Sequence, residues 1–90
     1  MFKTLEELIA VIRQRKDSPD EESYTYKLLH NKKLNVEKVK EEITELIDAI
    51  EKNTNKVHEA ADVLYHLMVL LEANGIKIED VMDELKKRQK

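Results

Sequence analysis

The amino-acid sequence predicts an all-α fold of four to five helices. Its 90 residues include one glycine and one proline, which leaves little material for the turns of a sheet. Glutamate, lysine and leucine are abundant, and apolar residues recur every three or four positions along much of the chain. We expect a single domain over residues 1–90, in which the helices form a bundle that oligomerisation completes.

Size and charge limit the partners of such a chain. A domain of 90 residues buries only about 60–70% of the surface that its unfolded chain exposes. An apolar helix face is therefore expected to pair with another copy, giving a homodimer or a higher homo-oligomer. The net charge of −3 argues against a nucleic-acid partner. Because the sequence has no cysteine, no apolar leader and no membrane-length stretch, we expect a cytoplasmic protein with no membrane partner.

Helix-start signals predict two helices near the N-terminus. Thr4 and Glu7 have the spacing of a capping box, and the apolar residues after them have helical spacing, so the first helix is expected to begin at Thr4. Residues 18–21 combine a serine, a proline and acidic residues in the order of a helix start. They predict a short second helix, which has an alternative start near Ser23.

Polar residues and a glycine mark the boundaries of the later helices. Asn35 is a suitable cap for a long third helix, which the Asn-Thr-Asn segment at 53–55 ends. A fourth helix is expected over residues 56–74, followed by Gly75 in the left-handed conformation, and a last helix begins near Ile78. The residues of the third helix that we expect to point inward are Val36, Val39, Ile43, Leu46, Ile47 and Ile50.

Carboxylates lie beside the apolar faces of the third and fourth helices. At about 100° per residue, Glu42 and Glu45 share one stripe of the third helix. The fourth helix is apolar nearly all round, yet it carries a stripe of Glu59, Asp62 and His66. Antiparallel packing of the two helices would bring the four carboxylates together, and such oxygen ligands suit Mg²⁺ or Mn²⁺. The pattern predicts metal-assisted chemistry on a phosphate ester or anhydride.

Simpler interpretations of these residues remain open. Glutamates on a helix face are usually solvated, so those of the third helix alone would indicate surface charge. The acidic pair set into an apolar fourth helix favours the metal site, because buried carboxylates need partners. His66 is expected to orient a carboxylate or to be a satisfied bundle histidine. The tyrosines expected to serve in packing are Tyr24, Tyr26 and Tyr65.

The motifs resemble those of a known superfamily. Glu41-Glu42-x-x-Glu45 followed by Glu59-x-x-Asp62 resembles the signature of the all-α nucleoside triphosphate pyrophosphohydrolases, the MazG-like superfamily. Within it, the chain resembles the phosphoribosyl-ATP pyrophosphohydrolase family from Thr4 to about Gln89. The segments that carry this resemblance are Ser23-Tyr24-Thr25, Lys38-Val39-Lys40-Glu41-Glu42, Glu59-Ala60-Ala61-Asp62 with Leu64-Tyr65-His66, and Asp80-Val81 to Leu85 to Arg88.

The resemblance implies a hydrolase of histidine biosynthesis. It would convert phosphoribosyl-ATP, a small-molecule substrate, into phosphoribosyl-AMP and pyrophosphate in the second step of that pathway. Mg²⁺, with Mn²⁺ as an alternative, would be held by Glu42, Glu45, Glu59 and Asp62. Glu41 and Glu45 are the expected catalytic residues, with Glu41 orienting or activating the attacking water. The expected substrate-binding residues are Arg13, Lys38, Arg88, Ser23, Tyr24 and Thr25.

Two other functions are weighed against this one. A housekeeping pyrophosphohydrolase acting on free nucleoside triphosphates would use the same carboxylates, but the Ser-Tyr-Thr segment argues against it. A non-catalytic helical module that pairs through the fourth helix would leave Glu59 and Asp62 unexplained.

Overall fold

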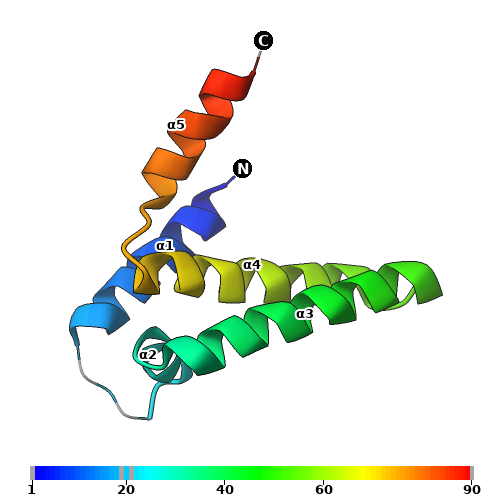
Figure 1. Cartoon of the computed structure of the whole chain (residues 1–90), viewed down its shortest axis with the longest axis horizontal. Coiled ribbons are helices and arrows are strands. Elements are labelled where there is room, and N and C mark those ends of the chain that lie inside the picture. The colour runs from blue at the N-terminus through cyan, green and yellow to red at the C-terminus, as the bar shows by residue number, and fades with distance from the viewer. Residues whose placement is uncertain (1, 19, 21, 90) are drawn as a thin grey trace.

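The computed structural model describes residues 2–18, 20 and 22–89, and the part it describes is all-helical. Helices α3 and α4 form a long antiparallel hairpin, with α1 and α2 packed near one end, whereas α5 projects away from it (Figure 1). Within the described ranges, none of the helices is both long and apolar enough to cross a bilayer. The predicted all-α class is confirmed, with helices α1 Lys3–Asp17, α2 Tyr24–Leu29, α3 Lys32–Lys52, α4 Lys56–Ala73 and α5 Ile78–Arg88.

The first two helices begin differently from the main predictions. Helix α1 begins at Lys3, because the carbonyl of Phe2 already accepts a hydrogen bond from the Glu6 amide at 3.1 Å. The predicted start at Thr4 is therefore wrong. For α2 the alternative start is confirmed, since the Ser23 hydroxyl accepts from the amide of Tyr26 at 3.3 Å. The earlier start rested partly on Pro19 and Glu21, which lie outside the described residues.

Helix α3 begins four residues before the predicted start, because Asn31 and not Asn35 is its cap, so this prediction is wrong. The side chain of Asn31 caps it by accepting from the Leu34 amide at 3.1 Å, and the added turn packs Leu34 against the core. The predicted cap, Asn35, is instead fully buried within the helix. The predicted break after α3 is confirmed, with Asn53 in the left-handed region, and Gly75 has the predicted positive φ of 71°.

The core lies where α1, α2 and α4 meet. Along α3, Val39 is buried, whereas Ile43, Ile47 and Ile50 are 42%, 50% and 57% exposed. The prediction that these three isoleucines point inward is wrong for the single chain, because α2 and α4 pack on other sides of α3 and leave them uncovered. An apolar face of the hairpin is thus left open. The core cluster itself consists of Ile9, Ile12, Leu28, Leu29, Met68 and Val69.

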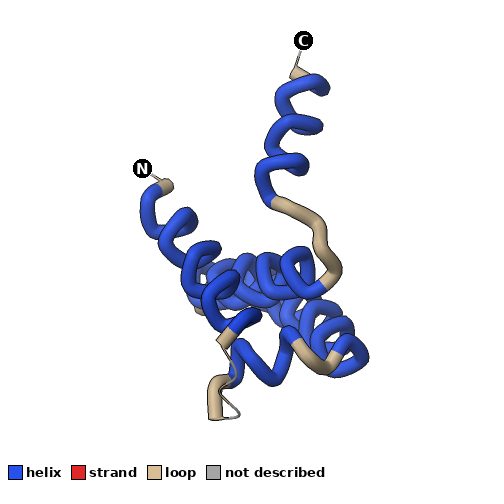
Figure 2. The backbone as a smooth tube through the Cα atoms, turned by 90° about the vertical axis from the view of Figure 1, so that its left-hand side faces the viewer, coloured by secondary structure: helices blue, strands red, loops and turns tan. Residues whose placement is uncertain are grey.

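An arginine of α1 ties the projecting helix to the hairpin. The Nε of Arg13 donates to Glu72 of α4 at 2.8 Å, and its terminal nitrogens donate to both oxygens of Glu79 of α5 at 2.6 and 3.0 Å. These hydrogen bonds from Arg13 lower the pKa of Glu79 to about 2. Figure 2 shows α1 and α5 extending to the same side of the hairpin, and the groove of about 660 Å³ between them has Leu5 and Met82 in its lining.

Candidate functional site

The carboxylates of α3 and α4 converge on one point of the hairpin. Because α4 returns antiparallel along α3 after a short turn, the C-terminal half of α3 faces the N-terminal half of α4. Glu42 and Glu45 of α3 and Glu59 of α4 each offer a carboxylate oxygen within 4.8 Å of the others. Asp62 joins Glu59 and His58 in a second group of the same span. The predicted set is therefore brought together as two groups that share Glu59.

Burial and mutual repulsion disfavour the charged forms of two carboxyl groups in the cluster. Burial raises the pKa of Glu42, which is only 9% exposed, and the charge of Glu45 raises it further. Burial, followed by the charges of Glu45 and Asp62, raises the pKa of Glu59 as well. One oxygen of Glu42 and one of Glu59 are buried without a hydrogen-bond partner among the described residues. Unpaired buried oxygens are costly, so this donor set fits a hard divalent ion such as Mg²⁺.

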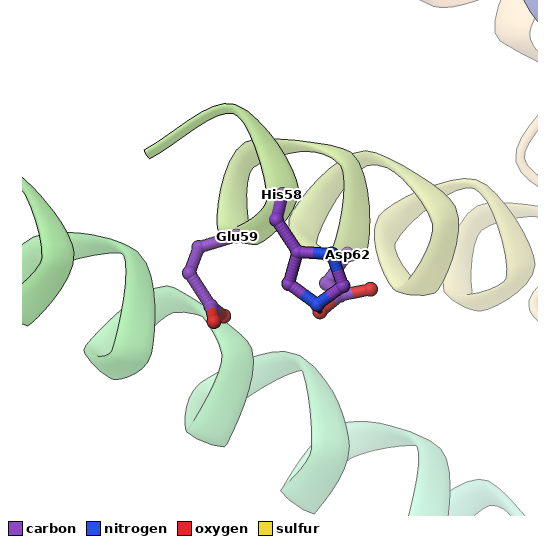
Figure 3. A group of neighbouring side chains, drawn as sticks. All are labelled: His58, Glu59 and Asp62. Atoms are coloured by element: carbon purple, nitrogen blue, oxygen red, sulfur yellow. Dashed lines mark ion pairs between the residues drawn. The ribbon is translucent and has the colours of Figure 1, made fainter. Parts of the chain in front are cut away.

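His58 is a neighbour of the acidic residues that the sequence reasoning did not single out. Its Nε2 lies 3.4 Å from Oδ2 of Asp62. In Figure 3 the His58 ring lies beside the Asp62 carboxylate, while the Glu59 side chain reaches toward the neighbouring helix. The signal was its position four residues before Asp62, which places both side chains on one face of a helix.

A histidine of α4 links the acidic site to α2. Nδ1 of His66 is 2.8 Å from the backbone carbonyl of Asp62, which can only accept, so this nitrogen carries the proton. In the neutral ring Nε2 then accepts from the Tyr24 hydroxyl, 2.9 Å away. Burial raises the pKa of Tyr24, which keeps the hydroxyl protonated as this donor. His66 is therefore a satisfied bundle histidine that holds Tyr24, as one of the two interpretations proposed.

Aromatic rings form a wall along the same stretch of α4. The rings of Tyr24 and Tyr65 stack with their centroids 6.3 Å apart, and His66 meets both rings edge-on. The hydroxyl groups of Thr25 and Tyr65 are hydrogen-bonded. Because the Ser23 hydroxyl caps α2, Tyr24 is the member of the Ser-Tyr-Thr segment that presents its side chain to solvent, at 45% exposure.

Two further predicted residues lie at the rim of the cluster. The ammonium group of Lys38 is 3.5 Å from a carboxylate oxygen of Glu41, one turn along α3. The charge of Glu41 raises the pKa of Lys38, and Tyr24 adds to this effect. The charges of Lys38, Glu41 and Glu42 also act on the pKa of Tyr24, so these residues lie near the exposed end of the aromatic wall.

The predicted arginines are not brought to the carboxylates within the chain. Arg13 is held by Glu72, which follows Asp62 by ten residues on α4, about 15 Å along the helix axis. Arg88 lies in the last turn of α5, 3.5 Å from Glu84, and α5 leaves the hairpin at the end away from the cluster (Figure 1). Their expected role as phosphate ligands therefore has no support from the single chain.

Two antiparallel helices that bring three carboxylates together, one of them buried, define a class of helical proteins with an all-oxygen candidate metal centre. Comparison with known proteins narrows this class. The family model described as phosphoribosyl-ATP pyrophosphohydrolase matches residues 5–89. The chain belongs to the phosphoribosyl-ATP pyrophosphohydrolase family, as the motifs indicated.

Curated relatives match along nearly the whole chain. A phosphoribosyl-ATP pyrophosphatase of Methanococcoides burtonii is 42% identical over 93 residues, which cover 98% of this chain and 94% of the relative. That of Pyrobaculum arsenaticum is 45% identical over 91 residues, covering 98% and 97%. The histidine biosynthesis bifunctional protein HisIE of Pyrococcus furiosus is 44% identical over 87 residues, covering 96% of this chain but 41% of that protein. The chain thus spans about two fifths of the bifunctional relative.

The bond between Tyr24 and His66 gives a testable stability difference. Tyr24→Phe leaves Nε2 of the buried His66 unpaired, so the free energy of unfolding should fall by about 1–2 kcal/mol in urea denaturation. Tyr26→Phe is the matched control, since Tyr26 contacts His30 through its ring. Equal losses in the two variants would contradict the assigned hydrogen bond.

Proposed function

We propose that the protein hydrolyses phosphoribosyl-ATP to phosphoribosyl-AMP and pyrophosphate in histidine biosynthesis, using Mg²⁺ or Mn²⁺. The observation that carries this proposal is the pair of buried, unpartnered oxygens on Glu42 and Glu59, which converge beside Glu45. The names of the relatives supply the substrate and the reaction.

The acidic residues would hold the cation, and the cation would make the site acceptable to a triphosphate. Glu42, Glu45 and Glu59 are close enough to share one ion after small side-chain adjustments, with Asp62 on the outer side. When bound, a divalent ion neutralises charge on the triphosphate and on the departing pyrophosphate. Without it, the clustered carboxylates would repel a polyphosphate.

The ion pair between Lys38 and Glu41 suggests how water is activated. The Lys38 ammonium is attracted more strongly to a substrate phosphate than to one exposed carboxylate. When Lys38 turns to the phosphate, Glu41 loses its partner and can accept a proton from a water molecule. The water oxygen then bonds to the α-phosphorus, and the bond between that phosphorus and the oxygen bridging to the β-phosphate breaks. Pyrophosphate departs with the electron pair of the broken bond.

The aromatic wall is the proposed contact for the rest of the substrate. Tyr24 exposes part of its ring beside Lys38, whereas the Ser23 and Thr25 hydroxyls are engaged in the bonds that hold α2 in place. We therefore assign contact with the substrate to Tyr24 and a positioning role to Ser23 and Thr25. A base or a ribose could lie against a tyrosine face of this kind.

The open apolar face of the hairpin supports a homodimer or higher homo-oligomer. A second copy would cover the exposed isoleucines of α3, and Val57 and Leu64 of α4 are exposed as well. Any contact of Arg88 with the substrate would have to come from such a copy, because α5 points away from the carboxylates of its own chain (Figure 1).

The substrate is tested by pyrophosphate release with Mg²⁺, from phosphoribosyl-ATP and from ordinary nucleoside triphosphates. Turnover should be specific for phosphoribosyl-ATP, and Glu59→Gln should lower it about a hundredfold or more by removing a cation ligand. Glu51→Gln, an exposed glutamate of α3, should have little effect. Preference for free nucleotides would indicate a housekeeping pyrophosphohydrolase instead. The absence of any metal-dependent pyrophosphate release would overturn the proposal that the protein is an enzyme.

The raised carboxyl pKa values predict a pH-dependent response to metal. In the metal-free protein, the folded state binds protons at Glu42 and Glu59 more tightly than the unfolded state, so these groups make stability fall as the pH rises above the usual 4.5. Mg²⁺ should therefore raise the Tm more at pH 8 than at pH 5. Glu42→Gln should raise the metal-free Tm at pH 8 and abolish most of the Mg²⁺ response in thermal melts. A Mg²⁺ response that is independent of pH would contradict this linkage.

Association is tested by analytical ultracentrifugation. Ile47→Glu places a charge in the middle of the open face and should shift the protein to a monomer at micromolar concentration. Val11→Glu, at an exposed valine of α1, is the control and should leave the oligomer intact. A wild-type monomer, or equal dissociation of the two variants, would exclude this face as the interface.

A further inference from the structure

Helix α5 has an apolar face without a partner in the single chain. The residues that form this face at helical spacing are Ile78, Val81, Met82 and Leu85. Among the described helices, α5 packs only on α4, and it stands clear of the hairpin in Figure 2. None of its 11 residues is buried, and Met82 and Leu85 are 49% and 48% exposed. Because an isolated helix of this length is marginal in water, we expect a further surface to cover the face.

The groove between α1 and α5 offers such a surface. It has a volume of about 660 Å³, and its apolar lining includes Phe2 and Leu5 of the N-terminal segment. The carboxylates that line it are Glu6, Glu79 and Asp83. Arg13 lies in the same lining but is already bonded to Glu72 and Glu79. The groove therefore suits an apolar ligand that carries positive charge at its edge.

Helix α5 has the charge distribution of a helix that pairs with a copy of itself. The acidic residues of its first half are Glu79, Asp80, Asp83 and Glu84, and the basic residues of its last turn are Lys86, Lys87 and Arg88. At about 100° per residue, Glu79 and Lys86 flank the same edge of the apolar face. In two antiparallel copies related by a two-fold axis, this edge meets itself, so that Glu79 of each copy faces Lys86 of the other. A parallel pair would instead bring the acidic halves together.

We propose that the groove between α1 and α5 receives α5 of a second copy, which lies antiparallel to the α5 that lines the groove. The apolar face of the incoming helix covers Phe2 and Leu5, and its basic last turn lies near Glu6 and Asp83. The contact is isologous, so the α5 of the first copy occupies the groove of the second in turn.

This contact is separate from the open face of the hairpin and adds to the association proposed there. A helix of 11 residues is about 16 Å long, so the contact is smaller than a standard interface of about 1,600 Å². It is therefore weak by itself. At micromolar concentration the hairpin face remains the main interface, and the pairing of α5 joins copies into a higher oligomer as the concentration rises.

Because the sequence has no cysteine, one introduced thiol reports the pairing directly. Met82→Cys places a thiol in the middle of the apolar face, and Lys87→Cys places one on the opposite side of the same helix. A disulfide needs Cα atoms within about 7 Å of each other, so under mild oxidation Met82→Cys should form covalent dimers at least about fivefold faster than Lys87→Cys. The measurement is non-reducing electrophoresis, and circular dichroism of each variant is the folding control.

An exchange of charges tests the antiparallel order. In the Met82→Cys background, Lys86→Glu brings an acidic group to the acidic groove of the other copy and should lower the cross-linked fraction about threefold or more. Adding Asp83→Lys to Lys86→Glu restores opposite charges across the contact and should recover most of this loss.

Three results would overturn the inference. These are equal cross-linking of Met82→Cys and Lys87→Cys, which indicates random collision, no cross-linking of either, and no recovery on adding Asp83→Lys. None of the substituted residues belongs to the acidic site, so pyrophosphate release by each variant tests the proposed hydrolysis separately.

Discussion

The packing of α3 against α4 imposes the constraint on which the rest of the molecule depends. It brings like charges from both helices into a partly buried space, where desolvation and mutual repulsion raise the pKa values of Glu42 and Glu59. Apolar residues at these positions would give a more stable hairpin, because burying charge without a partner costs several kcal/mol. The hairpin is therefore less stable than an apolar one would be, and in the proposed function a bound cation would offset this loss.

The remaining helices hold this hairpin rather than complete the acidic site. Helices α1 and α2 pack on the C-terminal half of α4, so that the apolar core and the carboxylates lie in different parts of the hairpin. The connection between them is polar: Tyr24 of α2 bonds to His66, which bonds to the carbonyl of Asp62. A displacement of α2 would therefore act on the backbone of Asp62 through two hydrogen bonds.

Much of this arrangement could be predicted from the sequence, and the failures have physical causes. The 3.6-residue period identified the helices and placed Glu42, Glu45 and Glu59 on facing stripes. Helix starts were less certain, because Asn31 and Asn35 are equally good caps and the packing of Leu34 decides between them. The pairing of Arg13 with Glu72 and Glu79 joins residues 59 and 66 positions apart, and local patterns carry no information at that range.

In the proposed function, the same constraint would couple the binding of the cation to the binding of the substrate. A triphosphate brings negative charge to a site that already repels it, whereas a bound cation lowers that repulsion and gains further oxygen ligands from the phosphates. Each ligand would therefore make the binding of the other more favourable, and this coupling would be reciprocal. The Lys38 and Glu41 pair would add to the coupling, since a phosphate that draws Lys38 away would leave Glu41 without its partner beside the cluster. The acidic site, which is unfavourable in the isolated protein, would then be balanced in charge only when both ligands are bound.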